Sequence, residues 1–251
     1  FSYNKTVSMD IPLDVAEKII LVIDTVIEPN STGFKTKNGD KYNSLLMTKR
    51  ISEIFIHNKL SFNLRNEFAI MTLDSQNVNW HSNFKKEDII PSLDAIKESN
   101  VKHEKYFNIQ PIFNIVHQQV SENKKLLDDY VVRVILLYTR SNIIPRFNLA
   151  DSSVQELIKN SNFYFDVLYI HELNCQKHKC EEIYIELKKL DIRNTSYIME
   201  VSRDAVGLHN LMGKFLAHPK QRVPLKQFNT AIHPMILKAF EESKKKAASE
   251  K

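Results

Sequence analysis

The chain of 251 residues has an ordinary globular composition, with 43% hydrophobic residues, 26% charged residues and a net charge of +5. No apolar run approaches the roughly 20 residues that span a bilayer, so we expect no membrane segment. Only four glycines are present, at positions 33, 39, 207 and 213, and they form no G-x-G-x-x-G, P-loop or G-x-S-x-G motif. Since those sites need glycine for close backbone approach, Rossmann dehydrogenases, P-loop NTPases and α/β-hydrolases are disfavoured.

The first half of the chain alternates between predicted strands and helices. Residues 18–26 contain five consecutive apolar side chains and end near an acid, Asp24, which is typical of a strand buried on both faces of a parallel sheet. After a polar loop over residues 28–40, apolar residues recur with a period of 3.6 over residues 42–58 and predict a helix. Strands over residues 67–74 and 77–82 are separated by only two residues, which predicts a hairpin.

The second half continues the alternation, with buried strands predicted over residues 130–139, 163–170 and 195–201. Five strands separated by helices, together with one hairpin partner, predict an α/β fold. We expect a doubly wound, mostly parallel six-stranded sheet with one antiparallel edge strand and helices on both faces. The remaining helices are expected over residues 88–98, 109–120, 151–159, 180–190 and 205–217.

Three segments are expected along the chain: an N-terminal extension (1–17), a single α/β domain (18–223) and a C-terminal tail (224–251) whose end is disordered. The tail has spaced apolar side chains and little of its own to bury them against. It therefore either docks in a partner's groove as a strand or helix, or folds back on its own domain. The predicted partner-binding residues are Lys220, Arg222, Pro224, Leu225, Phe228, Ile232, Met235 and Ile236.

The positive charge is concentrated around this tail. Residues 205–240 contain no acid but five bases, and such a local excess predicts a polyanion or an acidic protein surface as the partner. No RNA-recognition, helix-turn-helix or zinc-finger signature accompanies these bases, so we expect no direct nucleic-acid binding. The five bases are Lys214, Lys220, Arg222, Lys226 and Lys238.

Longer motifs carry a family resemblance. The stretches "YVVRVILLYTR" (130–140), "FYFDVLYIH" (163–171), "LDIRNTSY" (190–197) and "LHNLMGKFLAHPKQR" (208–222) resemble the scaffold subunit of the BRISC and BRCA-one-A deubiquitinase assemblies, the MERIT family. The first half is similar to that family over "KIILVIDTVIE" (18–28) and "NEFAIMTLDS" (66–75). The resemblance implies a von Willebrand factor A-like fold over residues 15–223.

The resemblance also implies a function without catalysis or a cofactor. A member of this family binds a BRE subunit built of ubiquitin-conjugating-variant folds, and through it joins an Abraxas-type subunit and a JAMM zinc protease. That protease cuts lysine-sixty-three-linked ubiquitin chains, in the cytoplasm and in the nucleus, and the scaffold subunit holds the assembly together.

A von Willebrand A domain that binds metal carries D-x-S-x-S after its first strand and a further Asp at a neighbouring strand end. Here Asp24 is retained, but Val26 and Glu28 stand at the two serine positions and Arg140 follows the strand over residues 130–139. Since Mg²⁺ prefers an octahedron of oxygens, the missing ligands predict a degenerate site without metal. The alternative, a metal-dependent adhesion module, would need bound Mg²⁺.

Arg140 suggests what replaces the metal. The two strand ends meet at one sheet edge, so its guanidinium can pair with Asp24 or with Glu28. The sequence leaves open a third arrangement, in which Arg140 faces solvent.

Other chemistry-bearing residues are weaker candidates. His171, Cys175, His178 and Cys180 have side chains that zinc accepts, but their spacing matches no standard finger, so we favour a polar loop with two free thiols. Two cysteines form no disulfide framework and fit a reducing compartment. No nucleophile elbow or H-E-x-x-H motif supports an enzyme. We expect His209 to pack or cap a helix and Trp80 to lie in the core.

Overall fold

The computed structural model describes residues 15–222, apart from residues 30, 36–38, 40, 83, 85–86, 101–103, 124–125 and 173–177. The predicted tail lies outside the described residues, as does all but the end of the predicted N-terminal extension, so the division of the chain into three segments stays a prediction. Among the described helices, none combines the length and the apolar character that crossing a membrane requires.

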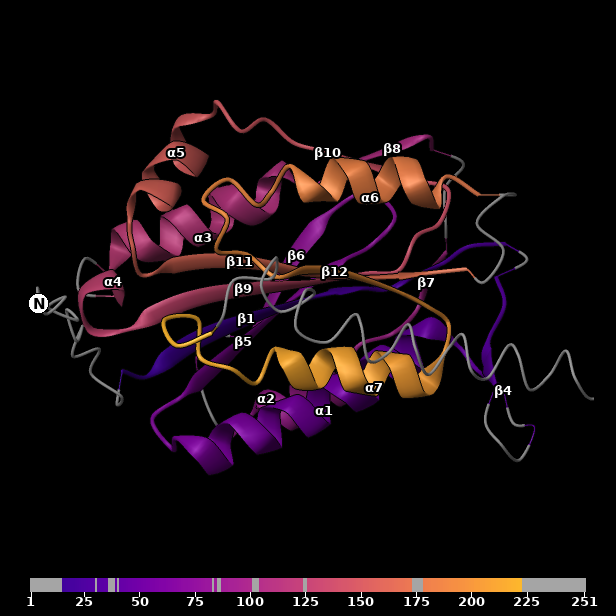
Figure 1. Ribbon diagram of the computed structural model, residues 1–251, viewed down its shortest axis with the longest axis horizontal. Helices are drawn as coiled ribbons and strands as arrows, with labels where there is room; N and C mark the ends of the chain where they lie inside the picture. The colour runs from indigo at the N-terminus through magenta and orange to yellow at the C-terminus, as the bar shows by residue number, and fades with distance from the viewer. Residues whose placement is uncertain are drawn as a thin grey trace, which may run out of the picture.

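A six-stranded sheet forms the centre of the molecule (Figure 1). Its neighbouring strands are parallel except for the last pair, which is the hairpin predicted from the two-residue connection. The mostly parallel α/β sheet with one antiparallel edge strand is therefore confirmed. In spatial order the strands are β12 (Ile198–Ser202), β11 (Phe163–His171), β9 (Val131–Tyr138), β1 (Glu17–Asp24), β5 (Glu67–Leu73) and β6 (Val78–Ser82).

Helices cover both faces of the sheet (Figure 1). On one face lie α1 (Ser44–Phe62), α2 (Ile89–Ala95) and α7 (Ala205–Lys214). The other face packs against α3 (Gln110–Glu122), α4 (Leu126–Asp129), α5 (Ser152–Lys159) and α6 (Cys180–Lys188).

Strand β1 explains why the apolar run in its sequence is unbroken. Successive side chains of a strand point to opposite faces. Ile20 and Val22 accordingly belong to one apolar core, whereas Ile19, Leu21 and Ile23 belong to the other. A strand between two helical layers needs apolar residues at every position.

Short ribbons that the sequence did not predict extend the loops: β2 (Val26–Ile27) with β7 (Ser99–Asn100), β3 (Phe34–Lys35) with β4 (Lys41–Tyr42), and β8 (Tyr106–Asn108) with β10 (Ile144–Arg146). Several predicted boundaries also move by a few residues. Helix α1 begins at Ser44, not residue 42, because the Asn43 side chain caps it by accepting a hydrogen bond from the Leu46 N–H at 2.8 Å. Asp151 caps α5 as predicted, through the Ser153 N–H at 2.9 Å.

Candidate functional site

Arg140 lies at the carboxyl edge of the sheet, where parallel strands β1 and β9 both end. Its Nε donates to both carboxylate oxygens of Asp24 at 3.0 Å, and its Nη2 donates to the Asp74 carbonyl at 2.6 Å. The side chains of Arg140 and Asp24 are 1% and 0% exposed. The Phe107 ring packs over the guanidinium, 3.9 Å from its central carbon. Of the arrangements that the sequence left open, the structure has the pair with Asp24.

Glu28 is engaged differently. Its two carboxylate oxygens accept the backbone N–H groups of Ser141 at 2.7 Å and Asn142 at 2.9 Å. Burial, to which the nearby charge of Asp24 adds, raises the pKa of Glu28. Both acids of the degenerate motif therefore fix the loop that follows β9.

The residues present do not fit a hard cation. Val26 offers no side-chain oxygen, and both oxygens of Asp24 already accept from a fixed guanidinium that would repel a metal ion. Over the described part of the chain, no three His, Cys, Asp or Glu side chains are grouped so that they could hold a metal. Asp24 is instead bound by Arg140, and Glu28 by the backbone of the loop that follows β9.

A second ion pair at the same edge was not foreseen from the sequence. The Arg203 guanidinium pairs with Glu172, and both side chains are nearly fully buried. The Glu172 carboxylate also accepts the Thr32 N–H at 3.0 Å. Glu172 follows β11 and Arg203 follows β12, so the signal in the sequence was one charged residue just beyond each of two adjacent strands.

The predicted cysteine and histidine loop is only partly described. The Cys180 thiol is buried at the start of α6, and His171 Nδ1 lies 2.8 Å from the Glu172 carbonyl. His178 Nδ1 lies 3.1 Å from the amide oxygen of Asn142. Cys175 falls outside the described residues, so zinc binding by this loop stays untested.

The two remaining single residues have ordinary surroundings. His209 Nδ1 lies 2.7 Å from the Ala205 carbonyl one turn earlier in α7, in a side-chain contact with its own helix. Trp80 is partly buried against the core and meets the Phe84 ring edge-on at 6.0 Å.

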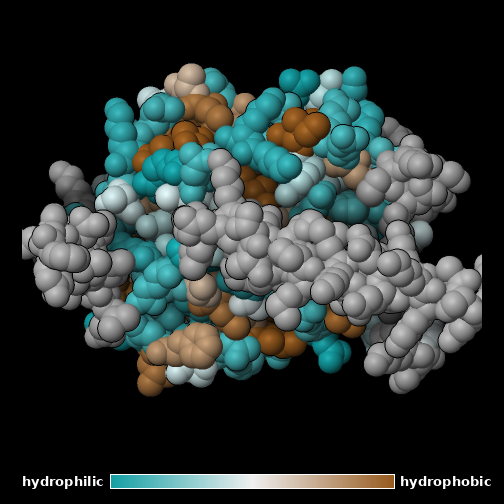
Figure 2. All heavy atoms as spheres, in the orientation of Figure 1, coloured by the Kyte–Doolittle hydropathy of each residue, from teal (hydrophilic) through white to brown (hydrophobic). Residues whose placement is uncertain are grey.

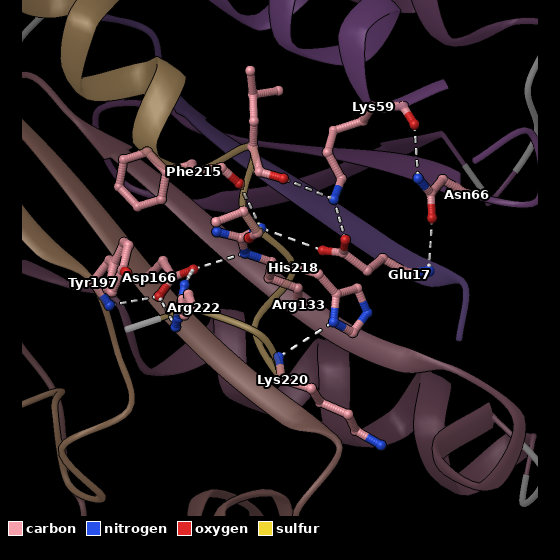
Figure 3. Close-up of polar contacts among 12 residues, drawn as sticks. Glu17, Lys59, Asn66, Arg133, Asp166, Tyr197, Phe215, His218, Lys220 and Arg222 are labelled. Atoms are coloured by element: carbon pink, nitrogen blue, oxygen red, sulfur yellow. Dashed lines mark hydrogen bonds and ion pairs between the residues drawn. The ribbon is translucent and has the colours of Figure 1, made fainter. Parts of the chain in front are cut away.

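At the opposite edge, where the parallel strands begin, Arg133 joins two acids (Figure 3). Its Nε donates to Asp166 at 2.7 Å, and its Nη1 lies 3.3 Å from Glu17. All three side chains are at most 1% exposed. Lys59, from α1, pairs with the second oxygen of Glu17. The signal that sequence reasoning missed is one charged residue inside each of two otherwise apolar strands, "YVVRVILLY" and "FYFDVLYI".

Arg222, predicted to contact a partner, is bound within the domain. Its Nη1 and Nη2 donate to the two oxygens of Asp166, each at 2.7 Å, and its guanidinium lies 4.1 Å from the centre of the Tyr197 ring. The side chain is only 2% exposed. Burial alone would raise the pKa of Asp166, but the charges of Arg133 and Arg222 outweigh it and hold that pKa below its ordinary value.

Lys220 lies in the same segment, and its backbone N–H donates to His218 Nδ1 at 3.3 Å. Binding of a partner by the Lys220 side chain stays a prediction. The other predicted partner-binding residues, Pro224, Leu225, Phe228, Ile232, Met235 and Ile236, lie outside the described residues.

Replacing Arg140 by methionine should lower the free energy of unfolding by about 3–5 kcal/mol, because Asp24 would remain buried without its partner. Urea unfolding measures this loss. Arg146→Met is the matched control, since Arg146 is exposed and its loss should change stability by only about 0.5 kcal/mol. Equal effects of the two variants would contradict a stabilising Arg140–Asp24 pair.

His218 should make stability depend on pH. Burial, helped by the charges of Lys59 and Arg133 and opposed by Glu17, lowers its pKa below the ordinary 6.5. The unfolded chain therefore takes up the proton first as the pH falls below 6.5, and the native state loses stability there. Unfolding experiments over this range should show a flatter pH profile for His218→Gln. An unchanged profile would exclude this contribution.

The chain has curated relatives and structural neighbours among known proteins. No family model matches the chain. BRISC and BRCA1-A complex member 1 of Xenopus tropicalis is 32% identical over 216 residues, which cover 82% of this chain and 66% of that protein. The human protein of the same name is 29% identical over 218 residues, covering 82% of this chain and 65% of its own length. The chain thus spans about two thirds of the length of these relatives.

Among solved structures, proximal thread matrix protein 1 from the mussel byssus aligns over 81% of this chain and 46% of its own, with a TM-score of 0.51 and 16% identity. The SpRpn10 VWA domain aligns over 83% of this chain and 99% of its own, with a TM-score of 0.45 and 12% identity. The mostly parallel α/β sheet agrees with the fold expected from the resemblance, and the chain belongs to the family of BRISC and BRCA1-A complex member 1.

Proposed function

We propose that the protein is a non-catalytic scaffold subunit of a deubiquitinase assembly. It binds a BRE-type subunit of ubiquitin-conjugating-variant fold and thereby stabilises a complex with an Abraxas-type subunit and a JAMM metalloprotease specific for lysine-sixty-three-linked chains. Its action in the cytoplasm and the nucleus is part of the same proposal. The names of the relatives support membership of such complexes.

The observation that carries the scaffold role is the Arg140–Asp24 pair. In a von Willebrand A domain that binds metal, the resemblance implies that the aspartate after the first strand is one of the metal ligands. Here that carboxylate is buried and bound to Arg140 on both oxygens. We infer that the partner is bound through direct side-chain and backbone contacts, which suits a permanent subunit of an assembly.

The alternative function, a metal-dependent adhesion module, makes an opposite prediction about Mg²⁺. We expect Mg²⁺ to leave the thermal unfolding midpoint of the protein unchanged, whereas a ligand that binds only the native state would raise it. The same titration on Arg140→Ser, which removes the fixed cation, provides a comparison. A midpoint that rises with Mg²⁺ in the unmodified chain would favour the adhesion module.

Complex formation tests the scaffold role directly. The full chain mixed with the BRE-type subunit should elute from a size-exclusion column as one peak that contains both proteins. A chain ending at Val223 should bind more weakly, because the tail residues from Pro224 onward carry spaced apolar side chains suited to a partner's groove. Separate elution of the full chain would refute the proposed partner, and full-strength binding by the truncated chain would show that the tail is not the anchor.

A further inference from the structure

We propose that the N-terminal edge of the parallel strands, at the end opposite Arg140, is the surface on which the protein partner docks. This inference rests on the proposed function, and it names the face that the subunit presents. The docking surface comprises the exposed end of α1, the hollow beside it and the segment over residues 215–222 that leaves the domain there.

Exposed apolar side chains mark this surface. Phe62, the last residue of α1, is 67% exposed, and Leu64 in the following turn is 75% exposed. They are the two most exposed large apolar side chains in the described part of the chain. Leu46, near the other end of the same helix, is 49% exposed. Two such neighbouring side chains beside a hollow are a feature of protein interfaces.

The hollow itself has a volume of about 300 Å³ and lies between the end of α1 and the segment that follows α7. Phe62 and Asn63 line it on one side, and Leu216, Ala217 and Gln221 line it on the other. Its floor includes Glu17 and Lys59 of the buried charge cluster. Polar groups make up most of its lining, with Asn66 and His218 beside Glu17 and Lys59, so it suits one or two polar side chains of a partner that covers Phe62.

The position where the C-terminal segment leaves the domain is fixed on the same surface. Arg133 donates to the carbonyl of Phe215 at 2.8 Å, and Lys59 Nζ lies 3.4 Å from the carbonyl of Leu216. Arg222 holds the end of the segment through a bidentate salt bridge to Asp166 (Figure 3). Residues 223–251 therefore continue from a point held against this edge, which makes Arg222 a positioning residue.

The charge of the segment selects the kind of partner. Residues 205–240 hold five bases and no acid, and Lys220 lies in the part that the structure describes. The partner is accordingly a protein surface that has apolar side chains to cover Phe62 and Leu64, polar side chains for the hollow and an acidic rim facing Lys220.

The test measures binding of the full chain to the BRE-type subunit by calorimetry. The double variant Phe62→Ser/Leu64→Ser should bind about tenfold more weakly, whereas Leu46→Ser, the control on the same helix, should bind as the unmodified chain does. Because all three side chains are well exposed, their thermal unfolding midpoints should stay close to that of the unmodified chain. Lys220→Glu should also weaken binding by placing an acid against the acidic rim.

Arg222→Lys separates positioning from direct contact. Lysine keeps the positive charge but cannot form the bidentate salt bridge to Asp166 or stack flat on Tyr197. We expect this variant to bind the partner about tenfold more weakly in the full chain, through loss of preorganisation, and to cause no further loss in a chain ending at Val223. An equal loss in both backgrounds would show that Arg222 does not act through the tail.

The outcomes distinguish the surface from the function. If the unmodified chain fails to bind the BRE-type subunit, the proposed function falls and this docking surface falls with it. If the unmodified chain binds but the double variant and Lys220→Glu bind equally well, the proposed function stands and the surface is wrong. Weakening by Leu46→Ser to the same extent would also overturn the assignment to this edge.

Discussion

Arg133 is a charge that cannot leave the interior, and much of the domain is arranged around it. Removing an ion from water costs several kcal/mol unless partners and hydrogen bonds replace the solvent. Strand β9 places Arg133 between Glu17 of β1 and Asp166 of β11, and its Nη1 also donates to the backbone carbonyls of Phe215 and Ala217 beyond α7. Three central strands and the end of the last helix must therefore come together in one register, because any slip would leave a buried charge unpaired.

The two edges of the sheet are closed by opposite excesses of charge. Where the strands end, three acids meet two arginines: Asp24, Glu28, Glu172, Arg140 and Arg203. Where the strands begin, two acids meet three bases: Glu17, Asp166, Lys59, Arg133 and Arg222. The carboxyl edge, which serves ligand binding in most open α/β sheets, is thereby committed to internal pairing. The acids at that edge stabilise the loops that follow the strands.

Sequence reasoning succeeded where the cause was local. The apolar runs at β1, β9 and β11 identify doubly covered strands, and parallel strand ends share one edge, so the pairing of Asp24 with Arg140 could be anticipated. It failed where the cause was register between distant segments. Nothing near Arg222 indicates that its side chain turns inward, because its receptor is built from Asp166 and Tyr197 on other elements. The short ribbons were not predicted because strands of two or three residues are too short to show a periodic pattern.

Arg222 links the buried charge cluster to the segment that follows it. Because Arg222 fixes the last described residues at this edge, a partner that binds this surface and also the residues that follow makes its second contact at a raised effective concentration. The gain requires the anchor to stay closed while the partner binds. The bidentate salt bridge to Asp166 and the contact with Tyr197 can keep the anchor in place, because together they restrict both the position and the orientation of the guanidinium. The charge that stabilises the sheet thus also determines where the chain leaves it.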